Sequence, residues 1–252
     1  MFEVSLNLLT MLLGAAFLAG FIDAIAGGGG LITLPALLLA GASPIEALST
    51  NKVQGSFGAA TAALSYARAG QVDLQSQRVP ALIALIAGLF GAVLATQLPT
   101  ETLHLIIPVI LIGVALFFAL KRGLSDEDQV QRIKPEVFMA LFVPLIGTYD
   151  GMIGPGAGAF YMIGFVTLAG YGILKATAHT KLLNFSSNIG GLVIFALFGA
   201  TWWFTGIAMG IAQVAGAALG AKLAVRVGAN VIRPLLVITS VALALRVFVQ
   251  ML

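Results

Sequence analysis

Ten apolar runs, bounded by glycine, proline or charged residues, make up most of this chain and dominate what it can fold into. Of the 252 residues, 60% are hydrophobic and only 9% are charged, whereas a soluble domain carries roughly 25% charged residues. Because too few charged side chains remain to cover a soluble surface, the sequence predicts an all-α polytopic membrane protein. The runs fall at about 5–25, 29–41, 45–67, 79–98, 102–120, 136–153, 157–170, 173–199, 203–226 and 231–251.

Two of these runs, at 29–41 and 157–170, are shorter than the others. A helix needs roughly 20 apolar residues to cross a membrane. We therefore expect each of the two to form a short or broken helix, which gives eight to ten segments in total. The sequence leaves open whether these short helices cross the membrane.

A motif of one aspartate followed by glycines occurs twice in the chain. The first copy lies at 23–30 and ends in four consecutive glycines, and the second copy lies at 150–158. Both copies interrupt an apolar run, which predicts a break in a membrane helix at each place. The glycines that we take as site residues are Gly27, Gly28, Gly29 and Gly30 in the first copy, and Gly154 and Gly156 in the second.

Further matches extend this repetition along both halves of the chain. Lys52 corresponds to Lys181, and the small residues Ala87, Gly91 and Ala95 correspond to a second set at 216–224. Faces of small residues allow close helix packing in lipid. Ordered matches of this kind indicate an internal repeat of about five segments per half. We assign residues 1–120 to the first repeat, 121–135 to a polar cytoplasmic linker and 136–252 to the second repeat.

Basic residues predict the orientation of the two repeats. The loops at 66–79, 121–135 and 222–233 contain Lys or Arg residues, and the loops at 97–103 and 199–203 contain neither. Because short cytoplasmic loops collect basic residues, we place the first three inside and expect both chain termini on the external side. With five crossings each, the two repeats would be inverted relative to one another.

Polar residues within the apolar runs mark a candidate substrate site. Lys52 and Lys181 each lie about 13 Å along the third helix of their half, close to the expected membrane midplane. Ionisable side chains at such depth are functional candidates. Glycine breaks also expose N–H groups at the start of the next helix, where anions bind. We therefore predict a cage for a small oxyanion, formed by the glycines, both lysines, Asn51, Gln54, Thr180, Asn184 and Asn188.

Three other ionisable residues have two interpretations each. Asp23 and Asp150 precede the glycines, where they either pair with the lysines or carry protons that are coupled to transport. His179 lies close to Lys181 in the sequence and is either a proton carrier or a hydrogen-bonded packing residue.

Several motifs carry a resemblance to a known family. They are the two aspartate–glycine motifs, Thr50-Asn51-Lys52, Thr180-Lys181 and Gly-Ala-Lys-Leu-Ala at 220–224. With these motifs the sequence resembles the TauE/SafE family, also called the sulfite exporter family. This resemblance covers nearly the whole chain. It implies a carrier in the bacterial inner membrane for small sulfur-containing anions such as sulfite or organosulfonates, often working as an exporter. The second half departs from the pattern, with His179 where the first half has Thr50.

The sequence thus favours a secondary transporter that works by alternating access around a midplane anion site. An anion channel remains an alternative, as does a proton-coupled carrier of another small ion that uses Asp23 and Asp150. The chain offers no metal-binding triad or nucleophile–histidine arrangement, so we expect no enzyme, metal or cofactor. The net charge of +3 is spread over loops, which gives no support to nucleic-acid binding. A homo-oligomer remains open.

Overall fold

A computed structural model describes residues 3–99, 101–102, 109, 127–198, 201–228 and 230. Every regular element within these ranges is helical. The protein is therefore an all-α membrane protein, as the apolar runs predicted. Two predicted segments, at about 102–120 and 231–251, lie wholly or largely outside the described residues. The same is true of linker residues 121–126.

The first half contains four described helices. Helix α1 (Leu6–Ala26) ends at Gly27, whose φ of 77° is left-handed, a backbone conformation that glycine adopts without strain. The short helix α2 (Gly30–Leu39) follows directly. Helix α3 (Pro44–Arg68) begins at a reciprocal cap between Ser43 and Glu46, and α4 (Arg78–Gln97) completes the half.

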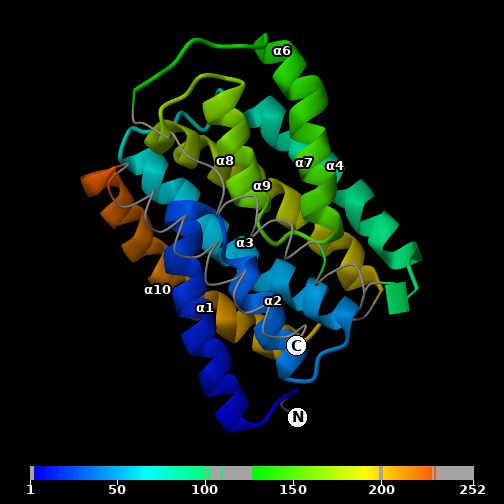
Figure 1. Ribbon diagram of the computed structural model, residues 1–252. Coiled ribbons are helices and arrows are strands. Elements are labelled where there is room, and N and C mark those ends of the chain that lie inside the picture. The colour runs from blue at the N-terminus through cyan, green and yellow to red at the C-terminus, as the bar shows by residue number, and fades with distance from the viewer. Residues whose placement is uncertain are drawn as a thin grey trace.

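The second half repeats this order. A broken helix made of α6 (Pro135–Val137), the π-helical turn η1 (Phe138–Phe142) and α7 (Val143–Met152) corresponds to α1. The short helix α8 (Ala157–Thr167), then α9 (Ile173–Leu197) and α10 (Trp203–Val227), correspond to α2, α3 and α4. Figure 1 shows α1 and α6–α7 entering from opposite ends of the molecule, as inverted repeats require.

The halves pack through reciprocal helix pairs, in which α1 contacts α10, α4 contacts α7, and α3 contacts α9. The predicted faces of small residues lie at these contacts. A Cβ added at Gly91 of α4 would overlap the backbone of Thr148 in α7, and one at Gly216 of α10 would overlap Phe17 in α1. Glycine therefore allows equivalent close approaches in the two halves.

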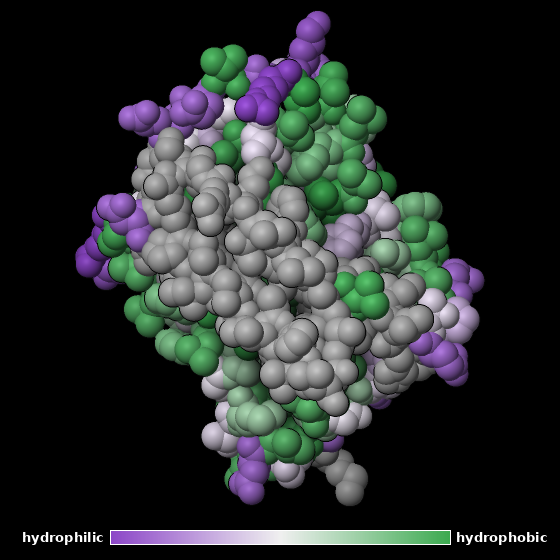
Figure 2. Space-filling model, in the orientation of Figure 1, coloured by the Kyte–Doolittle hydropathy of each residue, from purple (hydrophilic) through white to green (hydrophobic). Residues whose placement is uncertain are grey.

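Four of the described helices, α1, α4, α9 and α10, are long and apolar enough to cross a membrane. The short helices α2 and α8 have 10 and 11 residues, which is about 15 to 17 Å of helix and too little to cross a hydrocarbon core of about 30 Å. Large apolar side chains such as Phe90, Leu145 and Ile211 are exposed. Figure 2 shows hydrophobic surface between hydrophilic groups at the ends of the visible face, as a lipid-facing protein requires.

The second part of the linker lies against the turn between α8 and α9. Asp128 accepts hydrogen bonds from the Gly172 N–H (2.7 Å) and from Lys175 Nζ (2.7 Å), and the Gln129 N–H donates to the Gly170 carbonyl (2.7 Å). The bond from Lys175 and that from Gly172 lower the pKa of the Asp128 carboxyl below its ordinary value. This linker segment, residues 127–134, is thus tied to the second repeat.

We expect Asp128→Asn to loosen this attachment with little effect on global stability, because exposed ion pairs contribute less than about 1 kcal/mol. A carboxyl whose folded-state pKa is lowered stabilises the fold above its unfolded-state pKa, and this contribution is lost as the pH falls through the folded-state pKa. Acidification below the lowered folded-state pKa of Asp128 should therefore have the same effect as the substitution. Hydrogen exchange at the Gly172 amide measures both effects, and unchanged exchange in the variant would contradict the attachment.

Candidate functional site

The two glycine turns, one from each half, touch at the centre of the described structure. The Ala159 N–H, at the start of α8, donates to the carbonyl of Gly27 (3.1 Å). An added Cβ at Gly27 would lie 2.5 Å from the carbonyl carbon of Gly158, and one at Gly30 would lie 3.2 Å from Pro155 Cα. Side chains at these positions would push the two turns apart, so the contact between the turns requires glycine at both positions.

A cavity of about 30 Å³ lies between the turns and the long helices α3, α9 and α10. This central cavity has room for roughly two water molecules. Most of the predicted site residues line it: Asp23, Gly27, Gly30, Asn51, Gln54, Asp150, Gly154, Gly156, Asn184 and Asn188.

The remaining predicted residues do not line the central cavity. Lys52 and Lys181 are fully buried behind the aspartates. The Gly29 N–H donates to Asp23 Oδ1 (3.1 Å), and the Thr180 hydroxyl donates within its own helix to the carbonyl of Ala176 (2.9 Å). The other residues outside the lining are Gly28 and His179.

Sequence reasoning missed Gly55, Gly158 and Gln213, which also line the central cavity. Gly158 belongs to the second glycine motif and Gly55 follows the polar stretch of α3, so proximity to known motifs could have identified both. Gln213 is a buried polar residue in the apolar helix α10. Its polarity within an apolar run was the available signal.

Two buried ion pairs join the halves, and each lysine pairs with the aspartate of the opposite half. Lys52 Nζ lies 2.9 Å from Asp150 Oδ1, and Lys181 Nζ lies 3.3 Å from Asp23 Oδ2. Each ammonium also donates to the backbone carbonyl of the same aspartate. These carbonyls lie in the last turns of α7 and α1, where the helix dipole favours a positive charge.

Further hydrogen bonds hold the aspartates in place. Asp150 Oδ2 accepts from Asn184 Nδ2 (2.7 Å) and from the Ser187 hydroxyl (2.5 Å). Asp23 Oδ1 accepts from the Gly29 N–H, and its side chain is 12% exposed compared with 2% for Asp150. Burial of these four charges is tolerated because they neutralise one another and are hydrogen-bonded. The Asp150 pair is the better shielded of the two.

Three glycines at the starts of α2 and α8 lie at the central cavity. Gly30, Gly156 and Gly158 line it, and among the described residues their N–H groups donate to no protein acceptor. A Cβ at Gly30 would lie 3.5 Å from Asn51 Nδ2, so this amide group adjoins the same helix start. Such N-terminal N–H groups, together with the helix dipoles, form a binding place for an anion.

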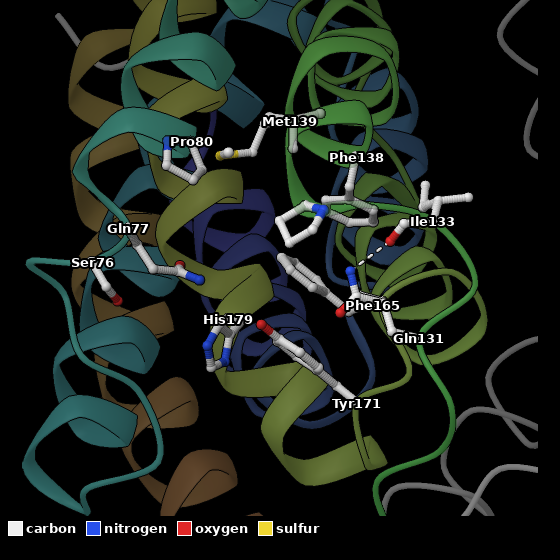
Figure 3. A pocket seen from close by; sticks show the side chains of 13 residues that line it. Ser76, Gln77, Pro80, Gln131, Ile133, Phe138, Met139, Phe165, Tyr171 and His179 are labelled. Atoms are coloured by element: carbon white, nitrogen blue, oxygen red, sulfur yellow. Dashed lines mark hydrogen bonds between the residues drawn. The ribbon is translucent and has the colours of Figure 1, made fainter.

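His179 lies in a different place, the linker-side pocket of about 220 Å³ that Figure 3 shows. Its Nδ1 bonds to the carbonyl of Lys175 (2.8 Å), and its ring packs edge-on against Phe165 and Tyr171. The pocket shares no residue with the central cavity. Within the described ranges, no group of three or more His, Asp and Glu side chains is arranged to hold a metal ion.

Comparisons with known proteins give one consistent result. The family described as "Sulfite exporter TauE/SafE" matches residues 12–247. A Sinorhizobium protein named "Probable membrane transporter protein ORF9" is 53% identical over 97% of this chain and 94% of the relative. The Escherichia coli K12 protein named "Probable membrane transporter protein YfcA" is 43% identical over 97% of this chain and 91% of the relative. No solved structure matches the chain.

Proposed function

Because the chain belongs to the sulfite exporter TauE/SafE family of membrane transporters, we propose that it carries small sulfur-containing oxyanions such as sulfite or organosulfonates. It works as a secondary transporter, in the direction of export, by alternating access. Its location is the bacterial inner membrane, with both termini on the external side.

The observation that carries this proposal is the central cavity, which lies where the two halves meet. Glycines at the starts of α2 and α8 line this cavity, and among the described residues their N–H groups donate to no protein acceptor. Such N–H groups complement the oxygens of an anion. The charges nearby are balanced, because two ammonium groups face two carboxylates. An anion that enters is therefore attracted by the N–H groups, and it acts on the two ion pairs through the aspartates that line the cavity.

The way the charges connect the halves supports alternating access. Each ion pair has one partner in each half, so a rocking movement of one half against the other must stretch or exchange these pairs. An anion in the cavity lies beside the two aspartates that line it, so its negative charge weakens their hold on the lysines and lowers the cost of that movement. Binding and rocking are thus coupled, as expected of inverted-repeat transporters.

One observation favours a second candidate function. Asp23 and Asp150 line the central cavity, whereas Lys52 and Lys181 do not. A proton-coupled carrier of another small ion would use the two carboxylates in this position. In that case, an imposed pH gradient should drive uptake of the other ion, and sulfur oxyanions should have no effect on it.

The test is a thermal-unfolding screen of the purified protein followed by flux into liposomes. Ligand at about 100 times its dissociation constant stabilises the native state by about 2.7 kcal/mol. We expect sulfite or a small sulfonate to raise the unfolding temperature and its flux to saturate with concentration. Chloride at equal ionic strength serves as the control. Flux that never saturates would indicate a channel, and a screen without any stabilising anion would contradict the proposal.

A further inference from the structure

Within the part of the chain that the structure describes, two buried amide oxygens of residues at the central cavity have no hydrogen-bond donor. They are Oε1 of Gln54 in α3 and Oε1 of Gln213 in α10, and both side chains line the cavity. The residues are 1% and 2% exposed. Because a buried acceptor without a partner is unfavourable, these oxygens indicate that a hydrogen-bond donor belongs in the cavity.

A hydrogen-bond network fixes the orientation of the Gln54 amide. Gln54 Nε2 donates to Thr33 Oγ1 (2.9 Å) and to Asn51 Oδ1 (2.7 Å). Asn51 Oδ1 also accepts from the Thr33 hydroxyl (2.6 Å). The Gln54 nitrogen therefore lies against this network, and its oxygen is the atom without a partner among the described residues.

Gln213 occupies a space that two glycines leave open. A Cβ at Gly20 of α1 would lie 2.6 Å from Gln213 Cγ, and a Cβ at Gly58 of α3 would lie 2.7 Å from Gln213 Nε2. The long polar side chain thus fits between α1 and α3 only because both positions lack side chains. This fit holds the amide group at the cavity.

The central cavity therefore offers both kinds of hydrogen-bonding group. Unpaired N–H groups of Gly30, Gly156 and Gly158 suit anionic oxygens, and the amide oxygens of Gln54 and Gln213 suit an N–H or O–H group. A donor-free oxyanion would satisfy the first set and leave the second unsatisfied. A ligand that satisfies both sets must carry anionic oxygens and a donor together.

We propose that Gln54 and Gln213 determine specificity by selecting anions that carry their own hydrogen-bond donor, an inference that rests on the proposed transport of sulfur oxyanions. Since the cavity is only about 30 Å³, the donor lies on or next to the atom that bears the anionic oxygens. Hydrogen sulfite in its O–H form fits this description, and fully deprotonated sulfite or sulfate does not.

The test compares two probes of equal charge and similar shape, sulfamate and methanesulfonate. Sulfamate carries an amino group where methanesulfonate carries a methyl group, so the two differ in the donor alone. We expect sulfamate to bind the purified full-length protein about 10- to 100-fold more tightly, because the methyl group leaves buried acceptors unpaired. Isothermal titration calorimetry at constant pH and ionic strength measures both affinities.

Variants assign this selectivity to the two glutamines. Gln213→Leu and Gln54→Leu should each remove most of the preference, mainly by weakening sulfamate binding. Gln77→Leu is the matched control, because Gln77 is also buried with an unpaired Oε1 but lines the linker-side pocket. It should retain the wild-type preference.

The outcomes separate this inference from the proposed function. Equal binding of the two probes by the wild-type protein, or tighter binding of methanesulfonate, would overturn the selection of donors and leave anion transport intact. A preference that persists in both folded glutamine variants would also overturn it. If neither probe nor sulfite binds, the proposed function itself fails. The wild-type comparison needs no variant, so a misfolded variant does not prevent the test.

Discussion

Replacing Lys52 with methionine should destabilise the folded protein by about 3–5 kcal/mol, because it leaves the carboxylate of Asp150 buried without its partner. Asp150 is nearly fully buried and lies 2.9 Å from Lys52 Nζ. Methionine keeps much of the length of the lysine side chain, so packing changes little. Unfolding by denaturant or heat in detergent measures the loss, and anion binding should disappear with it.

A matched double variant separates the charge from the packing. Lys52→Met combined with Asp150→Leu removes both charges and should recover most of the lost stability, since neutral replacement of a buried ion pair is often tolerated. Lys181→Met should cost less than Lys52→Met, because Asp23 is more exposed and its distance to the lysine is longer, 3.3 Å. A double variant as unstable as Lys52→Met alone would contradict the pairing.

Gly27→Ala should abolish transport. Its φ of 77° is unfavourable for alanine by roughly 1–2 kcal/mol, and the new methyl group would overlap the backbone at Gly158 and Ala159. Both effects act where the two turns meet, so the starts of α2 and α8 can no longer face one cavity. Flux into liposomes measures the loss.

Two other glycines provide controls for this prediction. Gly41 has a φ of 96° but an added Cβ there meets nothing within 4 Å, so Gly41→Ala reports the cost of the backbone conformation alone. At Gly14 there is neither a positive φ nor a neighbour within 4 Å, and Gly14→Ala should keep full activity. If Gly27→Ala transports as well as Gly41→Ala, the contact between the turns is not needed.

The sequence predicted the all-helical membrane fold and most of the cavity lining because their signals are local. Apolar runs mark helices, and glycines next to an acid mark breaks. The same signals located the short helices α2 and α8. The sequence left open whether they cross the membrane, and their observed lengths of 10 and 11 residues are too short for that. Local signals also located the faces of small residues at Gly91 and Gly216.

The connections between distant residues could not be predicted in this way. The sequence identified two lysines and two aspartates, but their pairing across the halves depends on how α1 and α7 approach α9 and α3. The sequence also predicted that the ammonium groups of both lysines line the cavity. In the structure the aspartates line the cavity and the lysines do not. Gln213 was overlooked because its role depends on Gly20 and Gly58, which belong to other helices.

The exchange of partners between the halves also bears on how such a chain could arise. Each half contributes one lysine and one aspartate to the two buried pairs, and each of these residues finds its partner in the other half. An ancestral single-half protein would complete both contacts only by meeting a copy of itself inserted upside down.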